Sequence, residues 1–471
     1  MTKSYDVAII GAGSAGLSAL REVRKQTDNF VLINDGSYGT TCARVGCMPS
    51  KALIEAAIAF HRRKALETFG VGGAERLTVD IPAVLRRVRG LRDGFVEGML
   101  KLTDDLKDRS IAGRARFLEP QVLAVGEHRV HAKKIIIATG SRPIVPKEWA
   151  ALGTRMLTSD DLFEQETLPS HMAVIGMGGL GSEIAQALAR LGIVVNGFDA
   201  AEHIAGLSDT HVNRQAVALL RAEFTLHLGQ TTEPVIEGER IRVRAGSESV
   251  VVDKVLVALG RPPNVDQMGL ENLGVELDER GVPPFDSRTM QIADLSVYIA
   301  GDANRHLPLL HEALDEGYIA GYNALRNEPV CFERRVPLAI VFTDPGIAVV
   351  GQPFAEFDED EIVIGEVDFS SQARARMATD NHGLLRVYVD RSSGRLSGAE
   401  MCAPQGEHLA HLLALAVQRK LTVRELLRMP FYHPVLEEGL RTALRDAASK
   451  LGGADVPDLS YCDRLGADAL D

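Results

Sequence analysis

Two cysteines five positions apart, Cys42 and Cys47, are the residues of this chain best suited to carry out chemistry. In a regular α-helix, Cα atoms five positions apart are separated by roughly 8.5 Å, whereas a disulfide tolerates a Cα separation of only about 7 Å. We therefore expect a distorted turn or a deformed helix start here if the two sulfurs bridge. Such a bridge would be strained, and strained, accessible disulfides are the ones that are made and broken during a reaction.

Two other interpretations of the pair stay open: two ordinary buried thiols, or half of a zinc site. Zinc needs further ligands at short spacing, and no CxxC motif or close histidine stands beside the pair, so we expect no metal. Lys51 follows Cys47 by one helical turn, where a cation would lower the pKa of a thiolate. Without the cysteines, Lys51 would be read as an ordinary solvated lysine.

His433, far along the chain, is a candidate acid–base group. Chemistry on thiols needs a base near the disulfide to move protons, and an imidazole titrates near pH 7. Glu438 follows five positions later and could orient and charge-stabilise that imidazole. Taken alone, His433 is one of 13 histidines, and a loop histidine before a proline is usually structural.

A glycine-rich turn near the start of the chain indicates a dinucleotide site. Residues 5–10 are expected to form a strand and residues 14–24 a helix, with Gly11, Gly13 and Gly16 at the turn. This strand–turn–helix context distinguishes the pattern from an ordinary tight turn. Backbone N–H groups and the helix N-terminus would then face a pyrophosphate.

The ribose of that first dinucleotide lacks the usual acidic partner. An acidic residue is expected about 20 positions after the turn, at the end of the next strand. The chain has Asn34 at the strand end and Asp35 just after it. Asn34 can hydrogen-bond a hydroxyl without charge, and Asp35 could instead belong to a loop.

A second glycine turn indicates a second dinucleotide site. Gly176, Gly178 and Gly181 follow an expected strand and open an expected helix, and Asp199 comes 23 residues after Gly176. A carboxylate there accepts ribose hydroxyls and repels a 2′-phosphate, and no arginine lies within residues 194–209, which favours NAD over NADP. The alternative is that Asp199 only caps a turn.

Composition and charge exclude several classes of protein. The 471 residues are 45% hydrophobic and 25% charged, as in ordinary globular proteins, and the length predicts about three domains. A net charge of −12 would repel a nucleic-acid backbone. The chain starts without a secretory segment and has no apolar run of about 18 residues. We expect a cytoplasmic protein without nucleic-acid or membrane partners.

The order of expected elements predicts an α/β protein with two Rossmann-like dinucleotide-binding domains and a C-terminal α+β domain. Two similar late strands, at 134–140 and 255–260, each end in a glycine turn and leave through prolines. From about residue 336, strands and helices alternate without a nucleotide fingerprint. The expected boundaries are 1–148 and 276–335 for the first domain in two parts, 149–275 for the second and 336–471 for the third.

Taken together, these residues resemble the pyridine nucleotide–disulfide oxidoreductases, and within that family the dihydrolipoamide dehydrogenases. The stretch from Cys42 through Cys47 to Met48-Pro49-Ser50-Lys51 carries the resemblance more specifically than either glycine turn. The resemblance covers roughly residues 4–448. It implies FAD in the first domain, NAD in the second, and a homodimer formed through the third, with a lipoylated acyltransferase or lipoyl carrier protein as partner.

The resemblance also implies a role for each site residue. Cys47 would be the thiol next to the flavin and Cys42 the thiol that meets the substrate, while Lys51 would pair with Glu183. His433, held by Glu438, would be the acid–base group, contributed by the partner subunit. The FAD-binding residues would be Gly11, Gly13, Ser14, Ala15, Gly16, Asn34, Asp35, Thr41, Cys42, Lys51, Ala138, Thr139, Gly140, Gly301 and Asp302. The NAD-binding residues would be Gly176, Gly178, Gly181, Asp199 and Gly260.

Five positions depart from the family pattern without removing a catalytic group. Asn34 replaces a glutamate, Thr40 a glycine, Phe431 a histidine and Gly346 a glutamate, and His311 stands at a helix start that in the family usually carries small apolar residues. The resemblance implies NAD-dependent oxidation of dihydrolipoyl groups to the disulfide through the cysteine pair and FAD. One alternative is a reductase of another disulfide, similar to glutathione reductase. The other is a flavoprotein that docks lipoyl proteins or senses redox state with little turnover.

Overall fold

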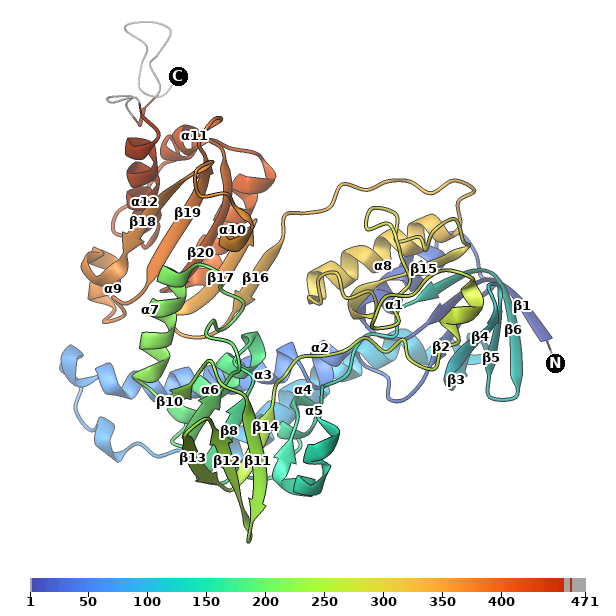
Figure 1. Cartoon of the computed structure of the whole chain (residues 1–471), viewed down its shortest axis with the longest axis horizontal. Helices are drawn as coiled ribbons and strands as arrows, with labels where there is room; N and C mark the ends of the chain where they lie inside the picture. Colours follow the sequence, from blue (N-terminus) through green and yellow to red (C-terminus); the bar gives the residue numbers. More distant parts are fainter. Residues whose placement is uncertain (1, 453–457, 460–471) are drawn as a thin grey trace, which may run out of the picture.

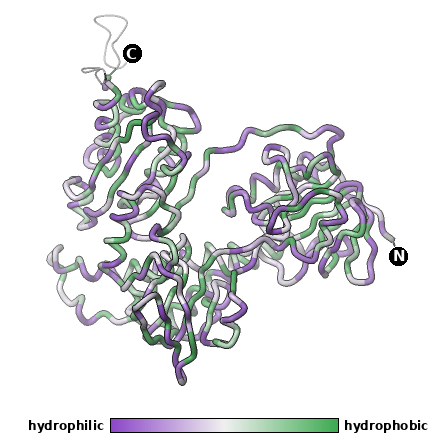
Figure 2. Tube along the Cα trace, viewed as in Figure 1, coloured by the Kyte–Doolittle hydropathy of each residue, from purple (hydrophilic) through white to green (hydrophobic). Residues whose placement is uncertain are grey.

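The computed structural model describes residues 2–452 and 458–459. Within them, the strands form four sheets. The first is mixed, with parallel central strands and two antiparallel strands at one edge, the second is parallel, and the other two are antiparallel. The first two are called the two parallel sheets after their central strands, and helices cover them and one face of the last antiparallel sheet (Figure 1). Hydrophobic segments gather in the central strands, as the green stretches of Figure 2 show. This arrangement confirms the α/β class with two Rossmann-like units and a C-terminal α+β unit. The exact boundaries between these units stay a prediction.

The first sheet is built from strands near the start of the chain and one strand near residue 300. Its strands are β1 (Thr2–Ile10), β2 (Phe30–Asn34), β3 (Ser110–Ala112), β4 (Ala115–Glu119), β5 (Val122–Val125), β6 (His128–Ile137) and β15 (Val297–Ile299). Their order is β3-β2-β1-β6-β5-β4, with β15 parallel to the end of β6. β1 is parallel to both β2 and β6, so the carboxyl ends of these strands meet at one edge.

Helices on one face of this sheet place the first glycine turn. α1 (Ser14–Val23) follows the turn directly and packs against α8 (Leu310–Ala324). The two helices approach closely because α8 presents glycines: a Cβ at Gly317 would lie 2.1 Å from the carbonyl oxygen of Ala15. Val7 and Ile9 of β1 face this helical layer, as the period-2 alternation of a strand requires.

The second parallel sheet repeats this plan. Its strands are β7 (Met156–Leu157), β8 (His171–Ile175), β9 (Val194–Phe198), β10 (Thr225–His227) and β14 (Lys254–Val257), in the order β10-β9-β8-β14-β7. The helices of this unit are α5 (Ser159–Leu162), α6 (Gly179–Arg190) and α7 (Thr210–Arg221). A small antiparallel sheet of β11 (Thr232–Glu237), β12 (Arg240–Ala245) and β13 (Glu248–Val252) is inserted before β14.

The last sheet is antiparallel and follows an extended connection after α8, in which hydrophilic and hydrophobic residues are mixed (Figure 2). Its strands are β16 (Leu338–Val341), β17 (Gly346–Gly351), β18 (Ile362–Asp368), β19 (Leu384–Asp390) and β20 (Leu396–Ala403), in the order β16-β17-β20-β19-β18. The accompanying helices are α9 (Ala373–Met377), α10 (Gly406–Gln418), α11 (Val423–Leu427) and α12 (Glu437–Lys450).

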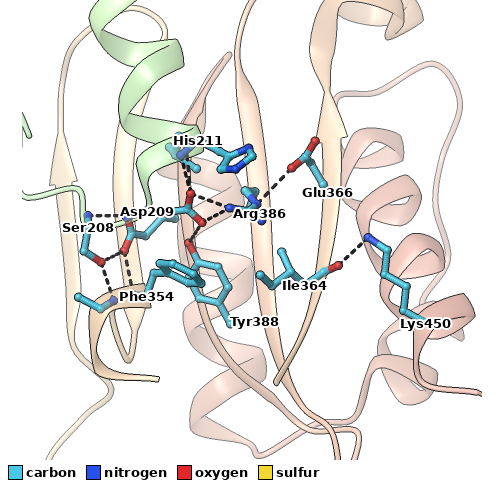
Figure 3. A network of polar contacts seen from close by, with 12 residues as sticks. Ser208, Asp209, His211, Phe354, Ile364, Glu366, Arg386, Tyr388 and Lys450 are labelled. Atoms are coloured by element: carbon cyan, nitrogen blue, oxygen red, sulfur yellow. Dashed lines mark hydrogen bonds and ion pairs between the residues drawn. The ribbon is translucent and has the colours of Figure 1, made fainter. Parts of the chain in front are cut away.

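A buried polar network fastens α7 to this last sheet (Figure 3). Asp209, the N-cap residue of α7, is fully buried and accepts hydrogen bonds from Arg386 at 2.6 and 2.7 Å and from the Tyr388 hydroxyl at 3.0 Å. Glu400 accepts the N–H groups of Ser208 and Asp209, each at 2.8 Å. The Asp209 carboxylate is therefore paired with a cation, and the Glu400 carboxylate is held by hydrogen bonds from neutral groups.

Three helices carry the cysteine region between the two parallel sheets. They are α2 (Thr41–Arg44), α3 (Cys47–His61) and α4 (Ile81–Asp104). α3 packs against α6, and the two helices share one core through Leu53 and Ala57 on α3 and Ile184 and Leu188 on α6. The start of α3 is thereby fixed relative to the second glycine turn.

Candidate active site

The two cysteines lie on two different helices. Cys42 is on the single turn of α2, and Cys47 is the first residue of α3. The intervening Val45 and Gly46 leave helical geometry, with ψ of 4° and −117°. The expected break in the helix is confirmed. Both cysteines are free thiols in this structure.

Thr40, one of the departures from the family pattern, has a local structural role. Its side chain is the N-cap of α2 and accepts the N–H of Ala43 at 3.1 Å. Threonine is a favourable N-cap residue because its oxygen satisfies an otherwise unpaired backbone N–H. The substitution therefore supports the turn that carries Cys42.

The two thiols have opposite protonation tendencies. The pKa of Cys47 is lowered to about 7, chiefly because the Cys42 thiol donates a hydrogen bond to it; burial opposes this, and the Lys51 ammonium lowers the pKa further. The same hydrogen bond, together with burial, raises the pKa of Cys42. Cys47 also stands at the N-terminus of a helix of 15 residues, which favours a thiolate. The reduced pair is therefore a Cys42 thiol beside a Cys47 thiolate.

Lys51 and Glu183 form the expected ion pair. Lys51 Nζ lies 2.9 and 2.8 Å from the two carboxylate oxygens of Glu183, which is only 4% exposed. Glu183 lies on α6, so this pair joins the cysteine helix to the second parallel sheet. The backbone N–H of Phe342 also donates to Glu183 at 2.8 Å. Phe342 could not be expected from the sequence, because it lies 159 positions away in the chain.

The first glycine turn fits an FAD pyrophosphate. A Cβ at Gly11 would lie 2.2 Å from the carbonyl oxygen of Ala138, and one at Gly16 would lie 1.9 Å from the carbonyl oxygen of Gly11, whereas Gly13 faces open space. Backbone can therefore approach a ligand here, next to the start of α1 at Ser14. Ala15 and Thr41 likewise occupy the first turns of α1 and α2.

A cavity of about 360 Å³ extends from this turn past the end of β2. Its lining includes Gly11, Asn34, Asp35 and Thr139, all expected from the sequence. The Thr139 hydroxyl is buried and has no hydrogen-bond partner within the described residues, so it can donate to a ligand. The lining also contains Arg114, Arg142, Asn264 and Asp266, which sequence reasoning missed because no local pattern marks them.

Asn34 takes the place of the expected acidic residue without disturbing the turn. Its side-chain oxygen accepts the N–H of Ala12 at 3.0 Å, and its amide donates to the carbonyl oxygen of Gly36 at 3.1 Å. The amide therefore braces the glycine turn from the end of β2. Its remaining lone pair can still accept a ribose hydroxyl.

Asp302 is held toward the first sheet by residues of two segments. Its carboxylate accepts the Ser141 hydroxyl at 2.6 Å, and Ser141 in turn accepts Arg261 Nε at 3.1 Å. The neighbouring Gly301 N–H donates to Glu316 at 2.7 Å. Burial raises the pKa of Glu316. These contacts fix the loop after β15, at the same sheet edge as Gly140, which has a positive φ of 69°.

The second glycine turn has the geometry that NAD requires. A Cβ at Gly176 would lie 2.4 Å from the carbonyl oxygen of Ala258, and one at Gly181 would lie 1.8 Å from that of Gly176. Gly178 faces open space, like Gly13 in the first turn. Gly260 has a φ of 107°, as a glycine turn after β14 requires.

Asp199 does more than cap a turn. One carboxylate oxygen accepts the N–H of Met177 at 2.6 Å and the other accepts that of Ala201 at 2.9 Å. The carboxylate therefore sits against the glycine turn at the end of β9. Its free lone pairs can accept ribose hydroxyls there.

His433 and Glu438 are paired as expected. His433 Nδ1 lies 3.0 and 3.1 Å from the carboxylate oxygens of Glu438, and this hydrogen bond lowers the pKa of Glu438. The His433 side chain is 73% exposed. Within the described part of the single chain, its ring hydrogen-bonds only to Glu438 and not to either cysteine.

Two negative findings bear on the expectations. Among the described residues, no group of three or more His, Cys, Asp or Glu side chains could hold a metal ion. The same residues include no helix that is long and apolar enough to cross a bilayer.

Comparison with known proteins identifies the class to which this fold and site belong. Residues 5–317 match the family described as pyridine nucleotide-disulphide oxidoreductase, and residues 337–444 match its dimerisation domain. The chain therefore belongs to the pyridine nucleotide-disulphide oxidoreductases, whose cofactors are FAD and NAD(H). The dimerisation domain supports a homodimer.

Two relatives of similar sequence identity are named for different reactions. A dihydrolipoyl dehydrogenase of Haloferax volcanii is 31% identical, over 94% of this chain and 96% of that protein. A mercuric reductase of Shigella flexneri is 32% identical, over 97% and 82%.

Solved structures share the fold. A Cu(II) complex of the HOCl-induced flavoprotein disulfide reductase RclA from Escherichia coli superposes with a TM-score of 0.81 at 23% identity, over 94% of this chain and 99% of that one. LpdA from Mycobacterium tuberculosis gives 0.80 at 24% identity, over 93% and 98%.

Proposed function

We propose that this chain oxidises dihydrolipoyl groups to the lipoyl disulfide and passes the electrons through Cys42 and Cys47 to FAD and then to NAD. The observation that carries the proposal is the His433–Glu438 pair in an enzyme whose cysteines form a thiol–thiolate pair. A dithiol substrate must lose two protons as it is oxidised, and this chain has a group for each. Relatives named dihydrolipoyl dehydrogenase cover most of the chain, which supports the same choice.

The first half of the reaction uses only groups of the protein and the substrate. One substrate thiol, deprotonated by His433, attacks the Cys42 sulfur of the oxidised pair, and Cys47 leaves as a thiolate. The second substrate thiol then attacks the substrate sulfur of the mixed disulfide and releases Cys42, which keeps the second proton. The substrate loses two electrons and two protons; the pair gains both electrons, and one proton each goes to Cys42 and His433.

The pKa values of the two thiols suit these roles. Cys47, with a pKa of about 7, is the better leaving group and is about half ionised at pH 7. Cys42, with its raised pKa, holds the proton. When bound, FAD supplies a two-electron acceptor and NAD supplies the final hydride acceptor. Lys51, fixed by Glu183, places a positive charge beside the electron path.

The acid–base group would act across the homodimer. His433 is exposed and meets neither cysteine of its own chain within the described residues. Since the dimerisation domain supports a homodimer, we propose that the partner's His433 serves this chain's cysteines. A lipoylated acyltransferase or lipoyl carrier protein would bring the substrate to the junction of the two subunits.

A second candidate is the reduction of another substrate by NADH or NADPH. The relative named mercuric reductase in Shigella flexneri supports it. Only one cysteine, Cys462, follows Cys402 in this chain, and it lies outside the described residues. A vicinal cysteine pair near the C-terminus is therefore absent from the sequence, which disfavours mercury as the substrate.

The test is steady-state turnover of the purified FAD-loaded protein with dihydrolipoamide and NAD. Parallel assays use NADP, oxidised glutathione with NADPH, and Hg(II) with NADPH. We expect rapid turnover with dihydrolipoamide and NAD alone. Turnover with glutathione or Hg(II) instead would replace the proposal with the second candidate, and no turnover with any of them would favour docking or redox sensing.

Two variants test the route of the electrons. Cys42→Ser should abolish dihydrolipoamide oxidation while FAD stays bound, because Cys42 is the sulfur that the substrate attacks. The matched control is Cys331→Ser, which removes an exposed thiol and should leave turnover unchanged. Full activity in Cys42→Ser would overturn the scheme. A pull-down with lipoylated protein, set against the kinetics with free lipoamide, separates turnover from docking.

A further inference from the structure

The segment from Phe342 to Asp344 connects β16 to β17 in the last sheet, yet it contacts the cysteine helix. The Phe342 N–H donates to Glu183 Oε1 at 2.8 Å, and the centroid of the Phe342 ring lies 4.6 Å from Lys51 Nζ. The dimerisation domain, the second parallel sheet and the cysteine helix therefore meet at Glu183. This segment is the part of the dimerisation domain that touches the Lys51–Glu183 pair.

The Phe342 N–H completes the hydrogen bonding of a buried carboxylate. Glu183 accepts two hydrogen bonds from Lys51 and one from Phe342, and it is 4% exposed. A buried carboxylate keeps a fixed position only while such bonds are made. The Phe342 N–H also shares the negative charge of Glu183, so the charge of Lys51 is not fully cancelled on the side of Cys47.

Two side chains of α6, Gln186 and Arg190, form a clamp that holds this segment in place. Gln186 donates to the carbonyl oxygen of Asp344 at 2.8 Å and accepts its N–H at 2.9 Å. Arg190 donates to the same carbonyl oxygen and to the Asp344 carboxylate, each at 2.7 Å. Glu183, Gln186 and Arg190 are spaced three and four positions apart, so they share one face of α6.

Arg190 of this clamp is held in turn by other charged residues. Arg190 is 5% exposed at its side chain and forms two further bonds to Glu223, at 2.7 and 2.8 Å. His61 at the end of α3 lies 3.7 Å from Glu223. Asp380, whose pKa burial and the charge of Asp344 raise to about 7, faces the same cluster. Arg190 is thus the cation that Glu223 and Asp344 share, and these contacts fix its position.

We propose that Gln186 and Arg190 are positioning residues, which hold the Phe342–Asp344 segment so that it fixes Glu183 and, through Glu183, the Lys51 ammonium at the cysteine pair. Neither residue touches the sulfurs. The inference rests on the proposed redox role of Cys42 and Cys47, and it is independent of the substrate. It makes the dimerisation domain a determinant of thiol chemistry.

Loss of the clamp has a defined consequence. If the segment moves away, Glu183 loses the hydrogen bond from the Phe342 N–H, and its negative charge is then shared with Lys51 alone. More of the Lys51 charge is offset, so the ammonium stabilises the Cys47 thiolate less. We expect the pKa of Cys47 to rise from about 7 by about one unit. At pH 7, the thiolate fraction would then fall about fivefold.

The test is Gln186→Met, which keeps the length of the side chain but removes both bonds to Asp344 and the bond of 2.8 Å that Gln186 donates to Glu223. The matched control is Gln121→Met, since Gln121 is an exposed glutamine with one bond to a backbone carbonyl. The readouts are the ultraviolet thiolate absorbance of the reduced protein against pH, and turnover against pH. Arg190→Lys, which keeps the charge but loses the forked contact, is the second variant and should give a smaller shift.

We expect a thiolate titration displaced to higher pH in Gln186→Met, a rate lowered about fivefold at pH 7 that recovers at higher pH, and an unchanged KM for NAD. The control should match the parent. A folded Gln186→Met or Arg190→Lys protein with an unmoved thiolate titration would overturn the proposal. The titration does not involve substrate, so it stays informative even if dihydrolipoamide is not oxidised.

Discussion

The turn at residues 11–16 and the turn at residues 176–181 have almost the same backbone geometry, but different side chains brace them. In both, a Cβ at the first glycine would strike the carbonyl of an alanine, and one at the last glycine would strike the carbonyl of the first. In the first unit, the amide of Asn34 accepts the N–H next to the first glycine at 3.0 Å. In the second, the carboxylate of Asp199 does so at 2.6 Å.

The side chains beside the two turns also differ. Beside the first turn lie the buried hydroxyl of Thr139 and a cavity of about 360 Å³. At the corresponding position beside the second turn stands Leu259, which is 38% exposed. The first turn therefore has a buried hydroxyl beside it where the second has an exposed apolar side chain.

The segment that follows the second strand also differs between the two units. After β2 it forms α2 and α3, which carry the cysteines, whereas after β9 it reaches α7, whose Asp209 is bound to Arg386 in the last sheet. In the first unit this segment carries the cysteines, and in the second it binds the unit to the last sheet. A repeated nucleotide unit is adapted here mainly through the segment that comes after its second strand.

The largest expected effect comes from filling the glycine turns. Gly16→Ala should abolish FAD binding, and Gly181→Ala should weaken NAD binding about hundredfold while FAD stays bound, because each Cβ would meet a carbonyl oxygen, at 1.9 and 1.8 Å. Flavin absorbance and NAD titration measure the two effects. Gly90→Ala, in open space on α4, is the control. Retention of FAD by Gly16→Ala would show that the first glycine turn does not hold FAD as the second turn is expected to hold NAD.

The side chains that brace the turns should be exchangeable at a cost of about tenfold in affinity. Asp199→Asn should keep the turn, because Asn34 shows that an amide can accept the same N–H, but NAD should bind about tenfold more weakly because charge-assisted hydrogen bonds are stronger. Binding titrations with NAD and NADP measure this, and NADP should gain relative to NAD. The reciprocal Asn34→Asp should leave FAD bound, and its loss would show that the first site excludes a carboxylate.

The two units should also differ in their dependence on pH. The Cys47 thiolate has a pKa of about 7, so it is protonated as the pH falls through that value, and dithiol oxidation should drop about tenfold from pH 8 to pH 6. Reduction of an artificial dye by NADH requires no thiol and should change little over the same range. If dithiol oxidation and dye reduction depended on pH in the same way, the Cys47 thiolate would not be the group that sets the pH dependence of dithiol oxidation.

The smallest expected effect concerns the unpaired hydroxyl beside the first turn. Thr139→Val should weaken FAD binding about fivefold, because it removes one hydrogen bond to the ligand worth about 1 kcal/mol. Equilibrium titration of the apoprotein with FAD measures it. Thr225→Val, at an exposed position on β10, is the control. Equal affinity in Thr139→Val and the parent would show that the hydroxyl does not contact the cofactor.

The sequence by itself determined the repeated strand–turn–helix units, the helix break between Cys42 and Cys47, and the Asn34 and Asp199 positions. These features are local: glycines are required where backbones approach, and apolar periodicity marks strands and helices within a dozen residues. The pairing of His433 with Glu438 was also expected from the residues, whereas the Lys51–Glu183 pair was expected only through the resemblance to a family. The structure confirms both pairs at hydrogen-bond distance.

Only the tertiary structure decided which distant residues complete these sites. Arg114, Arg142 and Asp266 line the cavity beside the first glycine turn, and Phe342 supports Glu183 from 159 positions away. No spacing in the sequence marks such residues, because side chains at the edges of different sheets are brought together by packing and not by chain order. The local chemistry is therefore encoded in short segments, while its protonation and position depend on contacts that arise only when the sheets assemble.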